Sequence, residues 1–152
     1  RYAAGFDGKH MRNLLFIGTT GLGKTHLSSA IAKEVVEGGF DVVYESAQRI
    51  FSDFEAEKFG RAAAGENRTE RYLSCDLLII DDLGTEMTTQ FTVSVLYQLL
   101  NTRLMEKKPV ILSTNLTPGE LASRYSPQIA SRILGTYRLC QFCGDDIRFK
   151  IK

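Results

Sequence analysis

The segment that most constrains the fold is an eight-residue turn, Gly18-Thr19-Thr20-Gly21-Leu22-Gly23-Lys24-Thr25. It has the spacing G-x-x-x-x-G-K-[ST], and it lies between an apolar run and a helical pattern. Glycines in such a turn let backbone N–H groups curl around an anion without interference from Cβ atoms. The helix that follows directs its free N–H groups and the positive end of its dipole to the same point. The segment therefore predicts a phosphate-binding turn where a strand meets a helix.

Lys24 and Thr25 extend this prediction to a nucleoside triphosphate with its metal ion. In this motif, the P-loop, the lysine reaches the β- and γ-phosphates and the threonine hydroxyl ligates Mg²⁺. A chance match is expected in on the order of 1% of chains this long. We therefore expect ATP and Mg²⁺ as cofactors. The residues expected to contact the nucleotide are Gly18, Thr19, Thr20, Gly21, Leu22, Gly23, Lys24, Thr25 and His26, the last as a helix-surface residue rather than a catalyst.

Polar side chains follow two further apolar runs. The run at 77–82, LLIIDD, ends in Asp81 and Asp82, which is the Walker B pattern. Asp81 is expected to hold Mg²⁺, directly or through water, and Asp82 to orient or deprotonate the attacking water. Asn115 follows the run VILST, where its amide could hydrogen-bond the γ-phosphate or its water. Taken alone, these acids could simply begin a turn, and Asn also suits turns. The nearby P-loop favours the phosphoryl-transfer interpretation.

Alternation of strands and helices predicts the fold class. Strands are expected at residues 13–18, 40–45, 76–81, 109–114 and 137–142. The central runs are continuously apolar, which is typical of parallel strands covered on both faces. Helical patterns include a stripe from Leu27 to Gly38-Gly39, a stripe from Leu96, a capping box at Thr117 and a helix from Pro127 to Gly135. The chain is therefore expected to be an α/β domain with a mostly parallel sheet.

Composition limits the number of domains, the kinds of partner and the compartment that the chain is expected to have. The chain has 152 residues, of which 43% are hydrophobic and 24% charged, and this suits one globular domain. Its net charge of +1 gives no overall basic field, so any nucleic-acid surface must be local. No apolar run approaches the roughly 18 residues of a membrane span. Three cysteines indicate a reducing compartment, and we expect the cytoplasm. Because the chain starts at Arg1, we expect residues 1–152 to be a fragment that lacks an N-terminal partner-binding domain.

The segment from 48 to 74 mixes aromatic and basic residues and has two interpretations. Phe51, Phe54 and Phe59 lie beside Arg49, Lys58, Arg61, Arg68 and Arg71. The favoured interpretation is an amphipathic helix with a solvated linker. The alternative is a basic edge that contacts a nucleic-acid backbone.

One cysteine pair, Cys140 and Cys143, has the spacing C-x-x-C. A zinc site would need two more ligands. Cys75 is remote in sequence, and the two histidines show no ligand spacing, so neither a metal nor a redox role is favoured.

With these motifs in place, the chain resembles the AAA+ ATPases. More narrowly, it resembles the ATPase domain of bacterial replicative-helicase loaders of the DnaC/DnaI type and the related IstB transposition helpers. The resemblance covers about residues 13–150. The segments that carry it are NLLFIGTTGLGKTHLSSAIA, CDLLIIDDLGTE, PVILSTNL, SRYSPQIASRIL and GDDIRFK. It implies a P-loop domain with five strands in the order 5-1-4-3-2, flanking helices and no C-terminal helical lid.

The resemblance also implies roles for individual residues. Asn115 corresponds to sensor 1 and Arg148 to the sensor 2 arginine. Arg132 matches the arginine finger that acts in a neighbouring subunit's site, with Arg124 as the competing candidate. The catalytic set is then Lys24, Asp82, Asn115 and Arg132. Asp82 departs from the usual glutamate, which suggests slow turnover with Glu86 as a second polar group.

The implied function is an ATPase that loads a helicase in DNA replication. By this resemblance, self-associated subunits bind single-stranded DNA, and the absent N-terminal domain contacts the hexameric replicative helicase, with no membrane involved. One alternative is an ATPase helper of DNA transposition. Another is a nucleotide-dependent interaction switch with negligible turnover. A small-molecule kinase is disfavoured because no arginine-rich lid is apparent.

Overall fold

The computed structural model of the chain describes residues 1–65 and 67–144. Five strands form one sheet in the order β2-β3-β4-β1-β5, and every neighbouring pair is parallel. The strands are β1 (Asn13–Ile17), β2 (Val42–Ser46), β3 (Leu77–Leu83), β4 (Val110–Thr114) and β5 (Tyr137–Gln141). The helices are η1 (Ala3–Gly5), α1 (Lys24–Glu37), α2 (Ala47–Lys58), α3 (Arg68–Ser74), α4 (Gln90–Met105), α5 (Pro118–Arg124) and α6 (Pro127–Thr136). The predicted parallel sheet and its strand order, read from the other edge, are confirmed.

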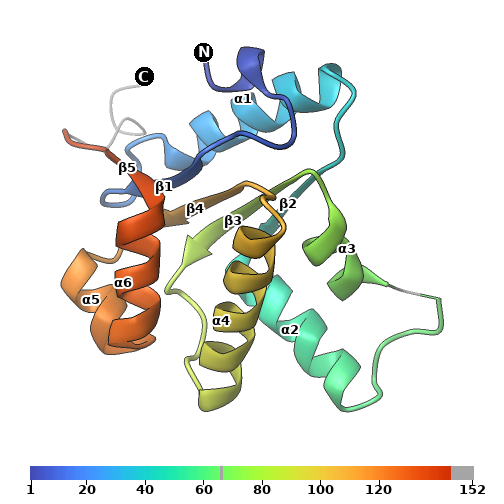
Figure 1. Cartoon of the computed structure of the whole chain (residues 1–152). Coiled ribbons are helices and arrows are strands. Elements are labelled where there is room, and N and C mark those ends of the chain that lie inside the picture. Colours follow the sequence, from blue (N-terminus) through green and yellow to red (C-terminus); the bar gives the residue numbers. More distant parts are fainter. Residues whose placement is uncertain (66, 145–152) are drawn as a thin grey trace, which may run out of the picture.

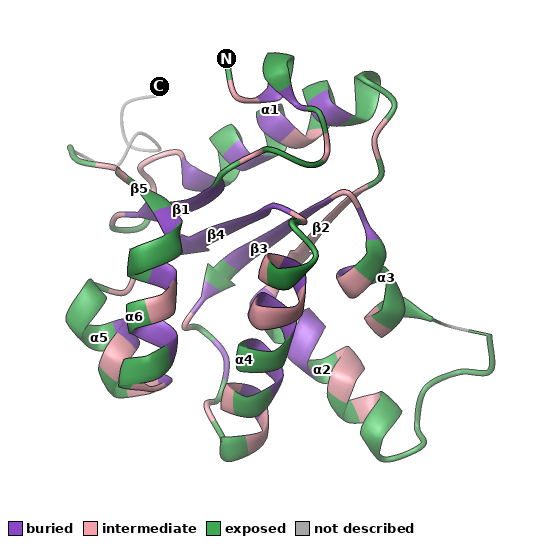
Figure 2. Cartoon of the chain, viewed as in Figure 1, coloured by how far each residue is buried: buried purple, intermediate pink, exposed green. Residues whose placement is uncertain are grey.

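The sheet is the middle of three layers (Figure 1). Successive side chains of β1 point to opposite faces, as in any strand. Leu14 and Phe16 pack with α1 and η1 on one face, whereas Leu15 and Ile17 pack with the helices α2 to α6 on the other. Both faces of the central strands are therefore buried (Figure 2), which explains their continuous apolar sequences.

Helix ends follow the local chemistry that the sequence predicts. The Thr117 hydroxyl accepts from the Glu120 N–H, and the Glu120 carboxylate accepts from the Thr117 N–H, which completes the capping box. Ser126 caps α6 by a single bond, in which its hydroxyl accepts from the N–H of Ile129. One expected boundary is wrong by a residue: α6 continues past Gly135 to Thr136, because the chain turns directly into β5 at Tyr137 without a left-handed residue.

The segment from 48 to 74 contains α2 and α3, joined by an exposed connection. Phe51 is buried and the ring centre of Phe54 lies 6.0 Å from that of Tyr72, so these two aromatic side chains contact the core, whereas Phe59 is exposed. Arg49 is paired with Asp53 at 3.1 Å, and Arg71 donates to Asp41 at 2.8 Å. These contacts support the interpretation as an amphipathic helix with a solvated linker.

Arg103 is completely buried near the end of α4. Its Nη1 donates to the carbonyl oxygens of Tyr72 and Cys75 at 3.0 Å, and its Nη2 donates to that of Pro109 at 2.9 Å. The guanidinium thereby joins the end of α3, the start of β3 and the start of β4. No helix in the described ranges is both long enough and apolar enough to cross a membrane.

Candidate nucleotide-binding site

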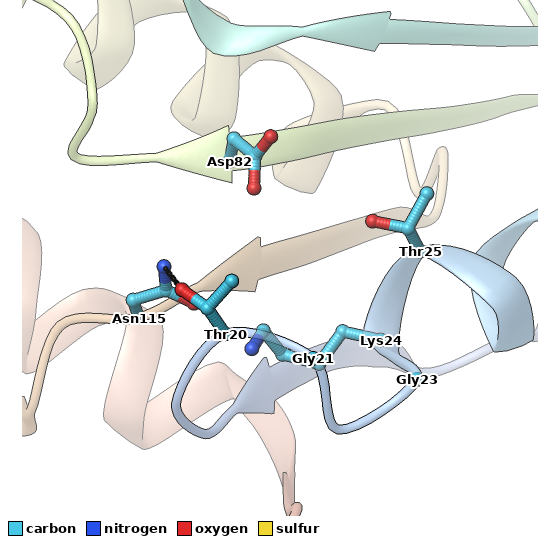
Figure 3. Close-up of a pocket in the computed structure, with 7 residues that line it drawn as sticks. All are labelled: Thr20, Gly21, Gly23, Lys24, Thr25, Asp82 and Asn115. Atoms are coloured by element: carbon cyan, nitrogen blue, oxygen red, sulfur yellow. Dashed lines mark hydrogen bonds between the residues drawn. The ribbon is translucent and has the colours of Figure 1, made fainter. Parts of the chain in front are cut away.

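Three segments meet in a cavity of about 320 Å³ at the carboxyl ends of β1, β3 and β4 (Figure 3). In an open parallel sheet, this edge is where ligands bind. The residues that line the cavity are Thr20, Gly21, Gly23, Lys24, Thr25, Asp82 and Asn115. The fold thus brings together side chains from all three motifs that the sequence identified.

The structure requires glycine in the P-loop for two different reasons. Gly21 and Gly23 have φ values of 83° and 92°, a left-handed backbone that side chains rarely adopt. Gly18 instead lies against β5: a Cβ there would come within 2.7 Å of the Phe142 carbonyl oxygen. Gly21 and Gly23 therefore shape the turn itself, whereas Gly18 lets the turn leave the sheet beside β5.

Lys24 is the first residue of α1, and only 6% of its surface is exposed. Its Nζ donates to the carbonyl oxygens of Gly18 at 2.5 Å and Thr19 at 2.8 Å. Burial lowers the pKa of Lys24, while the charges of Asp82 and Asp81 act in the opposite direction. The ammonium is therefore held inside the turn, beside the cavity where an anion would bind.

Asp81 is buried within β3, and both oxygens of its carboxylate accept hydrogen bonds. Oδ2 accepts from the Thr25 hydroxyl at 3.0 Å and from the Tyr44 hydroxyl at 2.6 Å. Oδ1 accepts from the N–H of Asp82 at 3.0 Å. Burial raises the pKa of Tyr44, and the Asp81 carboxylate adds to this. The contact joins the phosphate-binding helix to β3 and β2.

Tyr44 was missed by sequence reasoning. Its strand, β2, lies beside β3 with Ser46 opposite Asp81, so the tyrosine hydroxyl can reach the end of β3. The available signal was a tyrosine two residues before the end of an apolar strand. A tyrosine at that position indicates a contact with Asp81 only when β2 is known to lie beside β3.

The pair Thr25 and Asp81 suits a magnesium ion. Adjacent ligands of octahedral Mg²⁺, each about 2.0–2.1 Å from the metal, lie about 3 Å apart. The two oxygens are 3.0 Å apart and are of the hard type that Mg²⁺ prefers. Elsewhere in the described chain, no three His, Cys, Asp or Glu side chains gather to hold a metal ion. The other ligands of Mg²⁺ would be phosphate oxygens and water.

Asp82 lines the cavity from an unusual backbone conformation. Its φ is 54°, in the left-handed region, and its carboxylate accepts no hydrogen bond from the described part of the chain. Burial and then the neighbouring Asp81 raise the pKa of Asp82, whereas Lys24 lowers it. The left-handed turn directs one carboxylate of the pair into the cavity while Asp81 stays at the strand.

Asn115 follows β4 and faces the P-loop. Its Nδ2 donates to the Thr20 hydroxyl at 3.0 Å, the dashed contact in Figure 3. The amide therefore lies across the cavity mouth, at the strand end where the sequence predicted a polar residue.

Glu86 does not line this cavity, so its expected part as a second polar group is wrong. Only 5% of its surface is exposed, and its carboxylate accepts from the N–H of Gly84 at 2.9 Å and from the Tyr125 hydroxyl. Arg124 donates to the Glu86 carbonyl oxygen. These contacts tie the loop after β3 to α5, which is a structural role.

Several predicted site residues are described but do not line the cavity, namely Gly18, Thr19, Leu22, His26, Asp81 and Arg132. Arg132 is on α6, where its guanidinium donates to Asn101 and lies 5.5 Å from the ring centre of Tyr97. His26 is exposed on the first turn of α1. Arg148 falls outside the described residues. Nucleotide contacts by these three residues stay predictions.

Comparison with known proteins identifies relatives of this arrangement. The profile of the family "IstB-like ATP binding protein" matches residues 7–144. The replicative helicase loader DnaC of Escherichia coli K12 is 27% identical over 153 residues. That alignment covers 99% of this chain but 62% of DnaC, so the chain spans less than two thirds of this relative.

Solved structures share the fold. A crystal structure of the DnaC helicase loader superposes with a TM-score of 0.80 at 22% identity, covering 93% of this chain and 84% of that one. The replication initiator DnaA bound to AMPPCP and single-stranded DNA gives a TM-score of 0.74 at 29% identity, covering 92% and 43%. The fold is thus the AAA+ P-loop domain, and the profile match shows that the chain belongs to the family of IstB-like ATP binding proteins.

Proposed function

We propose that the chain binds ATP with Mg²⁺ and hydrolyses it slowly to ADP and phosphate. The observation that carries this proposal is the meeting of Lys24, Asp82 and Asn115 around one cavity. A cation, a carboxylate with a raised pKa and an amide are the groups that phosphoryl transfer to water requires.

Each residue has a distinct proposed part. Lys24 neutralises the β- and γ-phosphates, and the turn from Gly18 to Thr25 binds them with backbone N–H groups. Thr25 and Asp81 hold Mg²⁺, which would draw charge from the phosphate oxygens. Asp82 orients the attacking water and accepts its proton, and Asn115 hydrogen-bonds that water or the γ-phosphate. Asp82 is one methylene shorter than glutamate, which is consistent with slow turnover.

We propose that a second subunit completes the site with Arg132. Among the residues described, no arginine lines the cavity, although charge that develops during phosphoryl transfer is commonly stabilised by one. Arg124 donates to the Glu86 carbonyl oxygen and Arg132 donates to Asn101, so both candidates are engaged within their own chain, and the choice of Arg132 rests on the family resemblance. Arg148 is proposed as the sensor 2 residue.

The biological role proposed is helicase loading in DNA replication. The relatives are a replicative helicase loader and an initiator bound to single-stranded DNA, which supports single-stranded DNA as a partner. Contact with the hexameric helicase would be made by a further N-terminal domain. Family membership also favours a second candidate, an ATPase helper of transposition, for which preferential binding to duplex DNA would be evidence.

The test is the steady-state ATPase rate per subunit against protein concentration, with and without single-stranded DNA. Lys24→Ala controls for contaminating ATPases. A rate that rises with concentration and falls when Arg132→Ala protein is mixed in would support a shared site. A rate that does not change with concentration or with Arg132→Ala would contradict the proposal that Arg132 acts in a neighbouring subunit's site. Tight nucleotide binding without turnover would instead favour the interaction switch.

A further inference from the structure

The strands β1 and β4 begin at the end of the sheet opposite the ATP cavity (Figure 1). A second polar cavity lies at this end. We call it the N-edge pocket. Its volume is about 260 Å³, and it lies between the loop before β1, the α4–β4 loop and the end of α6. The residues that line it are Lys9, His10, Met11, Arg12, Asn13, Arg103, Leu104, Lys107, Lys108, Pro109 and Thr136.

The charge of this lining differs sharply from that of the chain. Five of its eleven residues are Lys or Arg and none is Asp or Glu, whereas the chain has 19 basic and 18 acidic residues. The nearest acids along the sequence are Asp7 and Glu106, and neither lines the pocket. Asp7 is already bonded to His10 at 2.9 Å. A concave surface with one sign of charge concentrates the electrostatic potential that attracts a ligand of opposite charge.

Arg103 adds a buried positive charge to this wall. Its guanidinium hydrogen-bonds to carbonyl oxygens and to the Cys75 sulfur, and the carboxylate of Glu106 acts on it electrostatically without a hydrogen bond or ion pair in the described chain. Carbonyl dipoles solvate the guanidinium but do not neutralise its charge, and a buried cation without a directly paired counter-ion is unfavourable. A bound anion in the N-edge pocket would offset this charge.

Three other cations of the pocket are available to a ligand. Lys9, Arg12 and Lys107 are exposed, and none of the three forms an ion pair within the described ranges. Lys108 is different, since its Nζ donates to the Ser74 carbonyl oxygen at 2.5 Å. The pocket therefore combines the buried positive charge of Arg103 with exposed cations at its rim.

We propose that the N-edge pocket binds phosphate groups, and that the phosphodiester backbone of single-stranded DNA supplies them. Lysine is depleted at protein–protein interfaces but supplies many contacts to nucleic-acid backbones, which favours DNA over an acidic protein. The identity of the DNA rests on the proposed function, whereas the phosphate chemistry rests on the pocket alone. Because the pocket and the ATP cavity lie at opposite ends of the strands, DNA and ATP can be bound at the same time.

The test uses a variant with three rim charges removed, Lys9→Gln/Arg12→Gln/Lys107→Asn. Asparagine is chosen at 107 because the φ there is 57°, which asparagine tolerates. The matched control is Lys33→Gln/Lys58→Gln/Arg61→Gln, which removes the same charge from other exposed positions, two of them in the 48–74 segment. Fluorescence anisotropy with a labelled oligothymidine would measure affinity over a range of salt concentrations, and thermal melting would verify folding.

The N-edge variant is expected to bind oligothymidine about ten-fold more weakly at 0.1 M salt. Its log–log salt slope should be smaller by about 2, since each lost contact to single-stranded DNA contributes about 0.7. ATP binding should be unchanged, and the control should bind like the unmodified chain. Equal affinity of the N-edge variant and the unmodified chain, or a loss confined to the control, would overturn DNA binding at this pocket.

Amide NMR shifts separate the sources of phosphate. Oligothymidine should shift the amides of Met11 and Lys108, which lie in the pocket, and inorganic phosphate should do so more weakly. If only inorganic phosphate shifts them, the pocket binds free anions and the DNA assignment is overturned. Tighter binding of polyglutamate than of oligothymidine would indicate an acidic protein partner instead. If the chain binds no DNA at all, the loader function fails, while the phosphate titration still decides whether the pocket binds anions.

Discussion

Tyr44 and Thr25 donate to the same carboxylate oxygen, Oδ2 of Asp81, at 2.6 Å and 3.0 Å. A magnesium ion would bind Thr25 through a lone pair of its hydroxyl oxygen, whereas the Tyr44 hydroxyl, which is not an expected metal ligand, would serve only to hold the carboxylate. Tyr44 is therefore a positioning residue for the metal ligand, and it belongs to a strand that carries no recognised nucleotide motif.

Tyr44→Phe tests this relationship. We expect ATP affinity in Mg²⁺ to fall about ten-fold, because a hydrogen bond to a charged group contributes about 1.5 kcal/mol. ATP affinity in EDTA should change less than about two-fold, since the Asp81 carboxylate that the hydroxyl holds is proposed to act on ATP through Mg²⁺. Isothermal titration calorimetry in the two buffers measures the difference.

Tyr72→Phe is the matched control for Tyr44→Phe. It removes another tyrosine–aspartate hydrogen bond, the 2.5 Å contact to Asp53, far from the cavity lining. A similar loss of Mg²⁺-dependent affinity in both variants would mean a general structural effect and would contradict the positioning role.

Asp82→Asn separates turnover from binding. The amide cannot accept the proton of the attacking water, so the ATPase rate should fall about 100-fold. ATP affinity should be retained, because the neutral side chain removes repulsion from the phosphates. Glu86→Gln, in contrast, should keep turnover within about three-fold and lower the melting temperature, because Glu86 is bonded to Gly84 and Tyr125. Loss of turnover in Glu86→Gln alone would reverse these assignments.

Gly84→Ala should destabilise the loop that follows the Walker B strand. The φ of Gly84 is 104°, and an added Cβ would lie 2.6 Å from Leu116. Strain of about 2–3 kcal/mol is expected, which for a chain this long is about 5–10 °C in melting temperature. Gly119→Ala is the control, since a Cβ there meets nothing within 4 Å. Equal melting temperatures for the two variants would show that the loop relaxes freely.

Arg103→Met should lower the free energy of unfolding by about 3 kcal/mol or more, measured by urea titration. Methionine fills part of the volume but leaves several carbonyl oxygens without a donor. Arg138→Met on the exposed side of β5 removes the same charge and should change stability by less than about 0.5 kcal/mol. A small effect of Arg103→Met would mean that water replaces the guanidinium.

Much of the fold was predictable because its signals are local. The strand that carries Asp81 and the capping box at Thr117 can both be predicted from short segments of sequence. The rule that parallel strands end at one edge then brings Lys24, Asp82 and Asn115 together without knowledge of packing. The family resemblance supplied the strand order, which the structure confirms.

Contacts between distant parts of the chain were decided only by the tertiary structure. Glu86 looked like a site residue from its position after Asp82, but its partner Tyr125 is 39 residues away and draws it into the interior. Tyr44 gained its role through a strand neighbour 37 residues away.

The sequence by itself determined which residues can bind a phosphate, because that ability depends on backbone freedom, charge and spacing within a few residues. The tertiary structure alone decided what surrounds them. Gly18 is needed because the Phe142 carbonyl oxygen lies too close to leave room for a Cβ. Arg103 is needed because carbonyl oxygens from three elements meet around its guanidinium and require a donor. Such roles arise from packing and burial, and these are properties of the folded chain rather than of any short segment.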